Sequence, residues 1–198
     1  MRLIFVFLFT FLCVDFAHAD SFFGVNIGEP YSLRKCDDND LNFQKNDSKD
    51  GYCSFPFNKT NLEWGETRYE VFKPAKIISP SWFKGGGGGF TVSEFEGKVV
   101  SIGVSTQGWD SQLSALKDLI EKFGKPTSRK NTRMINNFGV TFDVITAVWK
   151  KPTYTVTLRG VDSDDKDHGN VTIETKDDAL MEQRKKEWMK LNLPKAKM

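Results

Sequence analysis

The chain has 198 residues, of which 39% are hydrophobic and 27% are charged, and its formal net charge at pH 7 is +2. These fractions are ordinary for a globular protein and exclude wholesale disorder. The near-neutral balance gives no general attraction to polyanions, so the sequence indicates neither nucleic acid nor an anionic membrane surface as a partner.

The first nineteen residues have the three-part order of a secretory signal peptide. Met1-Arg2 is a short basic start, residues 3–14 form a phenylalanine-rich apolar run, and Ala17-His18-Ala19 has the small-x-small form of a cleavage site. The apolar run is well short of the ~20 residues that a membrane-spanning helix needs. We therefore expect cleavage after Ala19, no membrane span afterwards, and a periplasmic or secreted protein that folds as one domain over residues 20–198.

Two cysteines remain after Cys13 leaves with the signal peptide. Cys36 and Cys53 would lie in an oxidising compartment, so we predict a disulfide that clips the polar, turn-rich region 36–53. In the chain-entropy model, a disulfide that closes a loop of this length stabilises the folded state by roughly 3 kcal/mol. The spacing is too wide for a redox Cys-x-x-Cys motif, and no histidine lies near enough in the sequence to complete a zinc site.

The predicted elements of the first half are strands. Residues 22–28 indicate a short strand that ends in a glycine turn. Residues 68–79 indicate an edge strand or two short strands, because a proline interrupts the segment. Residues 90–95 and 98–105 flank Glu96-Gly97, which predicts a tight hairpin.

A helix is predicted after this hairpin. Asp110 or Ser111 can cap its start, Gly124 supplies a left-handed residue at its end, and Pro126 prevents it from continuing. Five apolar residues fall on one side of it, which we expect to pack on a sheet: Leu113, Leu116, Leu119, Ile120 and Phe123.

Three strands and a second helix follow. Strands are predicted at 140–149, 154–158 and 171–175. In the first of them the apolar residues change from even-numbered to odd-numbered positions after Val144, which suggests a bulge or a bend. Asp177 or Asp178 then caps a last helix, which carries Leu180, Arg184, Trp188 and Leu191 on one side. The order of elements predicts an α+β fold, an antiparallel sheet of about six strands packed on one face by the central amphipathic helix and the C-terminal helix.

Five consecutive glycines, residues 85–89, form the most conspicuous motif. A phosphate-binding loop would need Gly-Lys-Ser/Thr and a following helix, so that interpretation fails. Two interpretations remain, a loop whose aromatic neighbours dock on a peptide, glycan or protein, and a connection whose aromatic neighbours belong to the core. On the first interpretation the binding residues are Trp82, Phe83, Gly85, Gly87, Gly89 and Phe90.

The residues available for catalysis are few. With His18 removed, His168 is the only histidine, and it lies in an acidic loop. Zinc catalysis through two or three imidazoles is therefore excluded, and the acidic loop does not fit a calcium-binding EF-hand because Lys166 takes the fifth position from Asp162. A pair of carboxylates, as in glycosidases, stays open. The sequence favours a protein that is not an enzyme, and it indicates no metal and no cofactor.

Several short motifs occur in a characteristic order along most of the chain: Gly24-Val25-Asn26-Ile27-Gly28, the two cysteines, residues 97–102, Thr106-Gln107-Gly108, residues 122–127 and residues 167–173. This layout resembles small secreted proteins of Gram-negative bacteria and their prophages that carry no assigned function. The resemblance implies a bacterial periplasmic home and implies no active site.

These observations predict a periplasmic, non-catalytic binding protein whose partner is a periplasmic or envelope protein or a glycan. A prophage-type inhibitor or immunity protein, acting on a cell-wall enzyme or on phage entry, is one alternative. A carboxylate-based cell-wall hydrolase is another.

Overall fold

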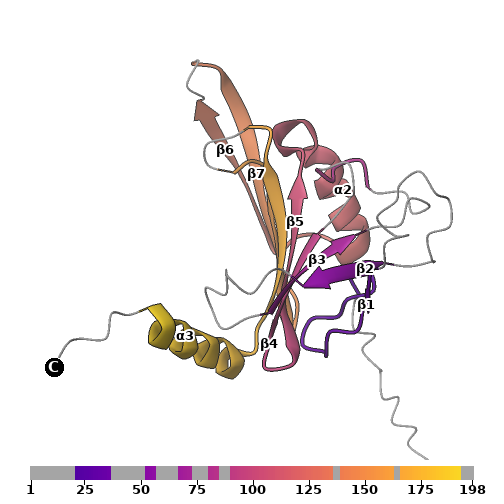
Figure 1. Cartoon of the computed structure of the whole chain (residues 1–198). Coiled ribbons are helices and arrows are strands. Elements are labelled where there is room, and N and C mark those ends of the chain that lie inside the picture. Colours follow the sequence, from indigo (N-terminus) through magenta and orange to yellow (C-terminus); the bar gives the residue numbers. More distant parts are fainter. Residues whose placement is uncertain are drawn as a thin grey trace, which may run out of the picture.

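The computed structural model describes residues 21–36, 52–56, 67–72, 80–84, 90–135, 139–162 and 166–192. Within them, nine strands form one sheet in the order β1-β2-β3-β4-β5-β9-β8-β7-β6, and the longer helices are α2 and α3 (Figure 1). All neighbouring strands are antiparallel except β1 and β2, which are parallel. The predicted α+β class is confirmed, but the predicted number of about six strands is wrong.

The strands are β1 (Arg34–Lys35), β2 (Cys53–Pro56), β3 (Thr67–Phe72), β4 (Phe90–Phe95), β5 (Lys98–Thr106), β6 (Ser128–Ile135), β7 (Thr141–Lys150), β8 (Tyr154–Arg159) and β9 (Gly169–Thr175). The helices are the short 3-10 helix η2 (Gly108–Asp110), α2 (Gln112–Phe123) and α3 (Asp178–Asn192). Both predicted helices are confirmed, and so are the hairpin of β4 and β5 and the strands β8 and β9. The signal-like segment 1–19 and the glycine run 85–89 lie outside the described residues.

One prediction of local structure is wrong, and one alternative of another is excluded. Phe22 and Val25 exchange backbone hydrogen bonds of 2.8 and 3.0 Å across a tight turn, so the segment predicted as a strand is a turn. The eight register pairs between β6 and β7 run without a shift, so the predicted bulge in β7 is absent and a bend is the alternative that is left. Val144 and Ile145 are both buried because they lie on opposite faces of the sheet.

The main core lies between α2 and one face of the sheet, which we call the α2 face. Four apolar side chains of α2 are buried there against β5, β7, β8 and β9: Ala115, Leu116, Leu119 and Phe123. The predicted apolar side of this helix is partly wrong, because Leu113 is 66% exposed and Ile120 is 39% exposed. Gln112 is buried in their place.

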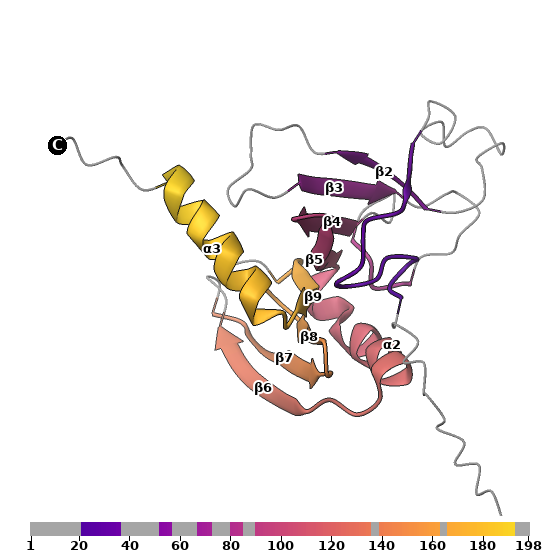
Figure 2. The ribbon, with the colours of Figure 1, turned by 90° about the horizontal axis from the view of Figure 1, so that it is seen from below.

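Helix α3 lies on the opposite side of the sheet from α2, as Figure 2 shows. Its start is capped by Asp177, whose carboxylate accepts a hydrogen bond of 3.0 Å from the backbone N–H of Leu180. Leu180 is buried with Phe95 and Val100. Val100 belongs to this smaller cluster and not to the main core, and it lies where the β4–β5 register shifts, between Val99 and Ser101. The expectation that both helices pack on one face is therefore wrong.

The predicted disulfide is confirmed. Cys36 and Cys53 are bonded, with their Cα atoms 4.9 Å apart, and both side chains are buried. The bond joins the end of β1 to the start of β2 at one edge of the sheet. Among the described helices, none has the length and apolar composition needed to cross a membrane.

Candidate interaction surface

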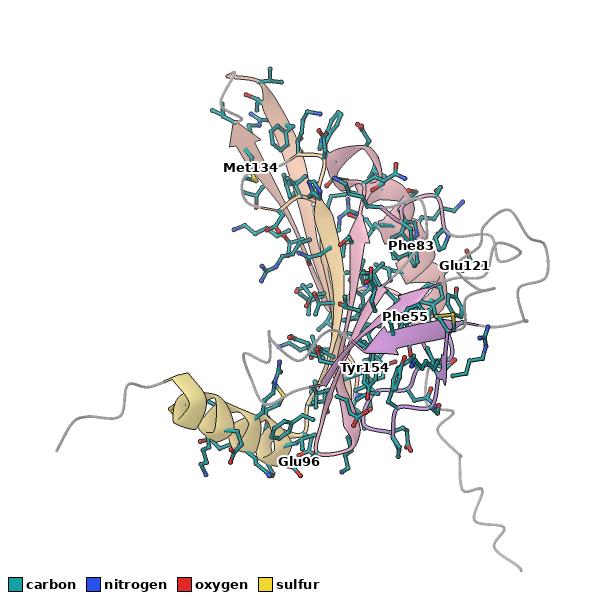
Figure 3. All side chains as sticks on the ribbon, in the orientation of Figure 1. Phe55, Phe83, Glu96, Glu121, Met134 and Tyr154 are labelled. Carbon is teal, nitrogen blue, oxygen red and sulfur yellow. A yellow bond between two sulfur atoms is a disulfide. The ribbon has the colours of Figure 1, made fainter. Side chains whose placement is uncertain are left out.

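The aromatic residues beside the glycine run belong to the core. Trp82, Phe83 and Phe90 are 2%, 4% and 2% exposed. The indole Nε1 of Trp82 donates a hydrogen bond of 2.8 Å to Asp118 of α2, and Phe83 lies on the side of the sheet that α2 covers (Figure 3). These side chains already use their contact area inside the molecule, so they do not form a docking surface. Gly85, Gly87 and Gly89 fall outside the described residues.

Most of the exposed large hydrophobic side chains lie instead at one end of the molecule, and Ile120 lies about two helical turns from Leu113, near the end of α2. Among the described residues these exposed side chains are Trp109 (45% exposed), Leu113 (66%), Ile120 (39%), Ile135 (69%) and Val140 (57%). Trp109 and Leu113 follow the end of β5, whereas Ile135 and Val140 flank the tip of the β6–β7 hairpin, and β5 and β6 both end at the top of Figure 1. Exposed apolar side chains that form one contiguous patch are typical of an interaction site. We name Trp109, Leu113, Ile120 and strand β6 the α2–β6 surface.

A fixed turn presents Trp109. Gly108 has a φ of +62°, and a Cβ at this position would collide with the carbonyl oxygen of Lys166. The side-chain hydroxyl of Ser111 donates 3.2 Å to the carbonyl of Gly108, and the N–H of Trp109 donates 2.8 Å to the carbonyl of Lys166. The turn is thus bonded to the connection between β8 and β9, so the backbone of Trp109 is held in place.

Gln112 fixes the start of α2 against β7. Its Nε2 donates to the carbonyl of Asp143, and its Oε1 accepts from the N–H of Ile145, both at 2.9 Å. β8 ends at Arg159, and the N–H of Gly160 is the last backbone group on that side, donating 2.7 Å to the carbonyl of Ile145. The amide of Gln112 therefore takes over the hydrogen bonds that a longer β8 would have made.

Leu113 and Ile120 lie on the flank of α2 that faces β7 and β6. Successive helix residues are rotated by about 100°, which places Leu113, Ile120 and Gly124 on one flank. The carbonyl of Gly124 accepts a hydrogen bond of 2.7 Å from the indole N–H of Trp149 in β7. The opposite flank carries Asp118, which is bonded to Trp82. The exposed side of α2 is thus turned toward the open edge of the sheet.

Strand β6 forms that edge and is exposed along almost its whole length. Its sequence has three cations, Arg129, Lys130 and Arg133, and no carboxylate. Odd-numbered residues of β6 lie beside the α2-face residues of β7, and even-numbered ones such as Met134 lie on the other face (Figure 3). Arg133 is 3.6 Å from Asp143, but both side chains are mostly exposed, so this ion pair contributes about 0–1 kcal/mol.

A second polar cluster lies at the other end of the α2 face. The rings of Tyr31 and Tyr69 are stacked with centroids 4.0 Å apart, and the hydroxyl of Tyr69 donates 3.2 Å to the carboxylate of Glu94. Burial raises the pKa of Tyr31 to about 12, and it also raises the pKa of Tyr69. Both phenols are neutral near pH 7, so Tyr69 serves there as a packing and hydrogen-bonding group and Tyr31 as a packing group.

Two further places on the molecule carry polar groups, the acidic loop with His168 and a hollow beside α3. His168 is exposed, and its backbone carbonyl accepts a hydrogen bond of 2.7 Å from the N–H of Asp162. In the described part of the chain, no three side chains of the metal-binding types come together. A hollow of about 700 Å³ between α3 and β9 is lined by Met181 and Met189 and by charged groups of both signs, so it favours no ligand charge.

Sequence reasoning missed the α2–β6 surface for identifiable reasons. Helical periodicity placed Leu113 inside, and β6 shows no apolar alternation that would predict a strand. The turn motif Thr106-Gln107-Gly108 was the one available signal that Trp109 is specially held. Comparison with protein-family models, curated proteins and solved structures finds no match for this chain.

Proposed function

We propose that this protein is a non-catalytic binding protein of the periplasm or the cell exterior, and that it contacts a protein partner through the α2–β6 surface. The observation that carries the proposal is Trp109, a 45% exposed tryptophan on a fixed turn, followed one helical turn later by Leu113, which is 66% exposed. Tryptophan is enriched among the residues that dominate binding energy. A backbone that is already ordered lowers the entropy lost on binding.

The proposed compartment has two supports. The first nineteen residues read as a secretory signal peptide. The disulfide between Cys36 and Cys53 is a bond that persists in oxidising compartments.

The chemistry of the surface favours a protein over a glycan as the partner. Trp109 can stack on a sugar as well as on a protein, but Leu113 and Ile120 are aliphatic and offer a sugar neither a stacking face nor a hydrogen bond. They do offer apolar area to a protein, worth about 25 cal/mol for each Å² that is removed from water. The cations of β6 would then lie at the polar rim of the contact.

Affinity capture with matched variants tests the proposal. The oxidised protein, residues 20–198, is immobilised as wild type, as Trp109→Ala, as Leu113→Ala and as the control Lys125→Ala, and is exposed to a periplasmic extract of the source organism. Bound proteins are quantified by mass spectrometry. Loss of a hot-spot side chain costs about 2 kcal/mol or more, so a specific partner should bind about thirtyfold less to the two surface variants and equally to the control.

Urea unfolding of the same four proteins supplies the necessary check. Leu113 and Lys125 are exposed, so their variants should unfold within about 0.5 kcal/mol of wild type. Trp109 is 45% exposed, so Trp109→Ala also loses partly buried area and should cost about 1–3 kcal/mol while the protein stays folded. Equal capture by all four folded proteins would refute the α2–β6 surface as the contact.

A further inference from the structure

The register of the sheet identifies which backbone groups of β6 point outward. The N–H of Lys150 donates 2.9 Å to Thr127, which precedes β6, whereas the N–H of Ile145 is bonded to Gln112 on the opposite side of β7. Since the backbone groups of successive residues alternate in direction, even-numbered residues of β7 face β6 and odd-numbered ones face away from it.

The odd-numbered residues of β7 are paired with odd-numbered residues of β6. In such a pair neither residue bonds the other, so the N–H and C=O groups of four β6 residues point away from the sheet: Arg129, Asn131, Arg133 and Ile135. No strand lies beyond β6 in the described part of the chain. β6 therefore presents a regular ladder of outward donors and acceptors.

The charge of β6 selects what can pair with this ladder. A second copy of the same edge would bring its three cations against those of the first, and like charges on facing strands destabilise the pairing. An extended segment that carries carboxylates would meet Arg129, Lys130 and Arg133 with the opposite charge. The edge thus resists self-association and favours an acidic strand.

We propose that β6 receives an acidic, extended segment of the protein partner as an additional strand of the sheet. Every second side chain of that segment would lie on the α2 face, on the same side of the sheet as Leu113 and Ile120. This inference rests on the proposed function, because it assigns the cations and the outward backbone groups of the α2–β6 surface to one occupant. The backbone ladder supplies affinity, while carboxylates on the α2 face, beside Arg129 and Arg133, supply specificity.

Hydrogen exchange gives the most direct test. The probe is an eight-residue peptide of alternating Asp and Val, the length of β6, and the control peptide replaces each Asp by Lys. In the free protein the amides of Arg129, Asn131, Arg133 and Ile135 should exchange faster than those of the even-numbered residues between them. The acidic peptide should slow these four amides about tenfold or more, and the control peptide should leave them unchanged. Protection that is absent with the acidic peptide, or equal with both peptides, overturns the proposal.

Two variants separate strand addition from simple charge attraction in a fluorescence-anisotropy titration. Asn131→Pro removes an outward N–H, which an edge strand tolerates in folding, and should weaken binding of the acidic peptide about tenfold, whereas Thr132→Ala should not. Reversing the charges with Arg129→Glu and Arg133→Glu should transfer the preference to the Lys peptide. Undiminished binding by Asn131→Pro refutes strand addition, and an unchanged preference after charge reversal refutes the acidic occupant.

The failure of this inference can be told apart from that of the proposed function. A partner whose capture depends on Trp109 but not on Asn131 would leave the proposed function standing and overturn strand addition. Formation of a dimer at working concentrations, measured by light scattering, would show that β6 takes a second copy and would also overturn the inference.

Discussion

Replacing Gln112 by alanine should destabilise the protein far more than is usual for a polar residue on a helix. The substitution removes the acceptor of the Ile145 N–H and the donor to the Asp143 carbonyl. Ile145 is 3% exposed, so its N–H would be buried without a partner, which costs about 1–3 kcal/mol. Asp143 is exposed, so water can bond its carbonyl at little cost. With the small cavity left by the truncated side chain, the expected loss of unfolding free energy is about 2–4 kcal/mol.

Urea unfolding of the oxidised protein, followed by tryptophan fluorescence, measures this loss. The control is Lys117→Ala, a substitution of an exposed residue of the same helix, which should change the unfolding free energy by less than about 0.5 kcal/mol. The slope of the transition should stay the same in both variants. Faster exchange of the Ile145 amide in Gln112→Ala would trace the loss to the predicted group. A loss below about 0.5 kcal/mol would refute the view that Gln112 substitutes for a missing strand at the edge of β7.

Three further predictions concern stability. Alanine at Trp82 or at Phe83 should each lower the unfolding free energy by about 3–5 kcal/mol, and an unchanged melting temperature would contradict their place in the core. The double variant Cys36→Ser, Cys53→Ser should lose about 3 kcal/mol in urea unfolding, and reduction of wild type should reproduce this loss. The raised pKa of Tyr31, about 12 against the usual 10.0, favours the protonated phenol in the folded state, so stability should fall as the pH rises from 10 toward 12. Tyr31→Phe should flatten that decline in melting temperature, and an equally steep decline would assign it to other groups.

The elements with local signals were predictable. Helix α2 begins after Ser111 and ends before Gly124, with Pro126 beyond, although the side chain of Ser111 bonds Gly108 and makes no capping hydrogen bond. The β4–β5 turn has φ values of +51° at Glu96 and +74° at Gly97, the backbone that a two-residue hairpin requires. In both cases the residues that define the structure lie within a few positions of each other, so their order in the chain contains the information.

The candidate surface depends on residues that are distant in the chain. Periodicity assigned Leu113 to the core and ignored Gln112, because the hydrogen bonds that bury Gln112 come from residues 143–145. The sequence left Trp82 open as a core or a contact residue and assigned Leu113 to the core. Only the position of α2 on the sheet makes the first 2% exposed and the second 66% exposed.

By itself, the sequence determined the pairing of Cys36 with Cys53, because only two cysteines remain after the signal peptide. It also determined the type of the long elements and the α+β class, because capping residues and turn residues act locally. The tertiary structure decided that β6 is an edge strand, that α3 crosses to the other face and that Trp109 stays exposed. The physical reason is that burial is a property of what packs against a side chain. For this protein those neighbours come from segments far apart in the chain, whose meeting no local pattern records.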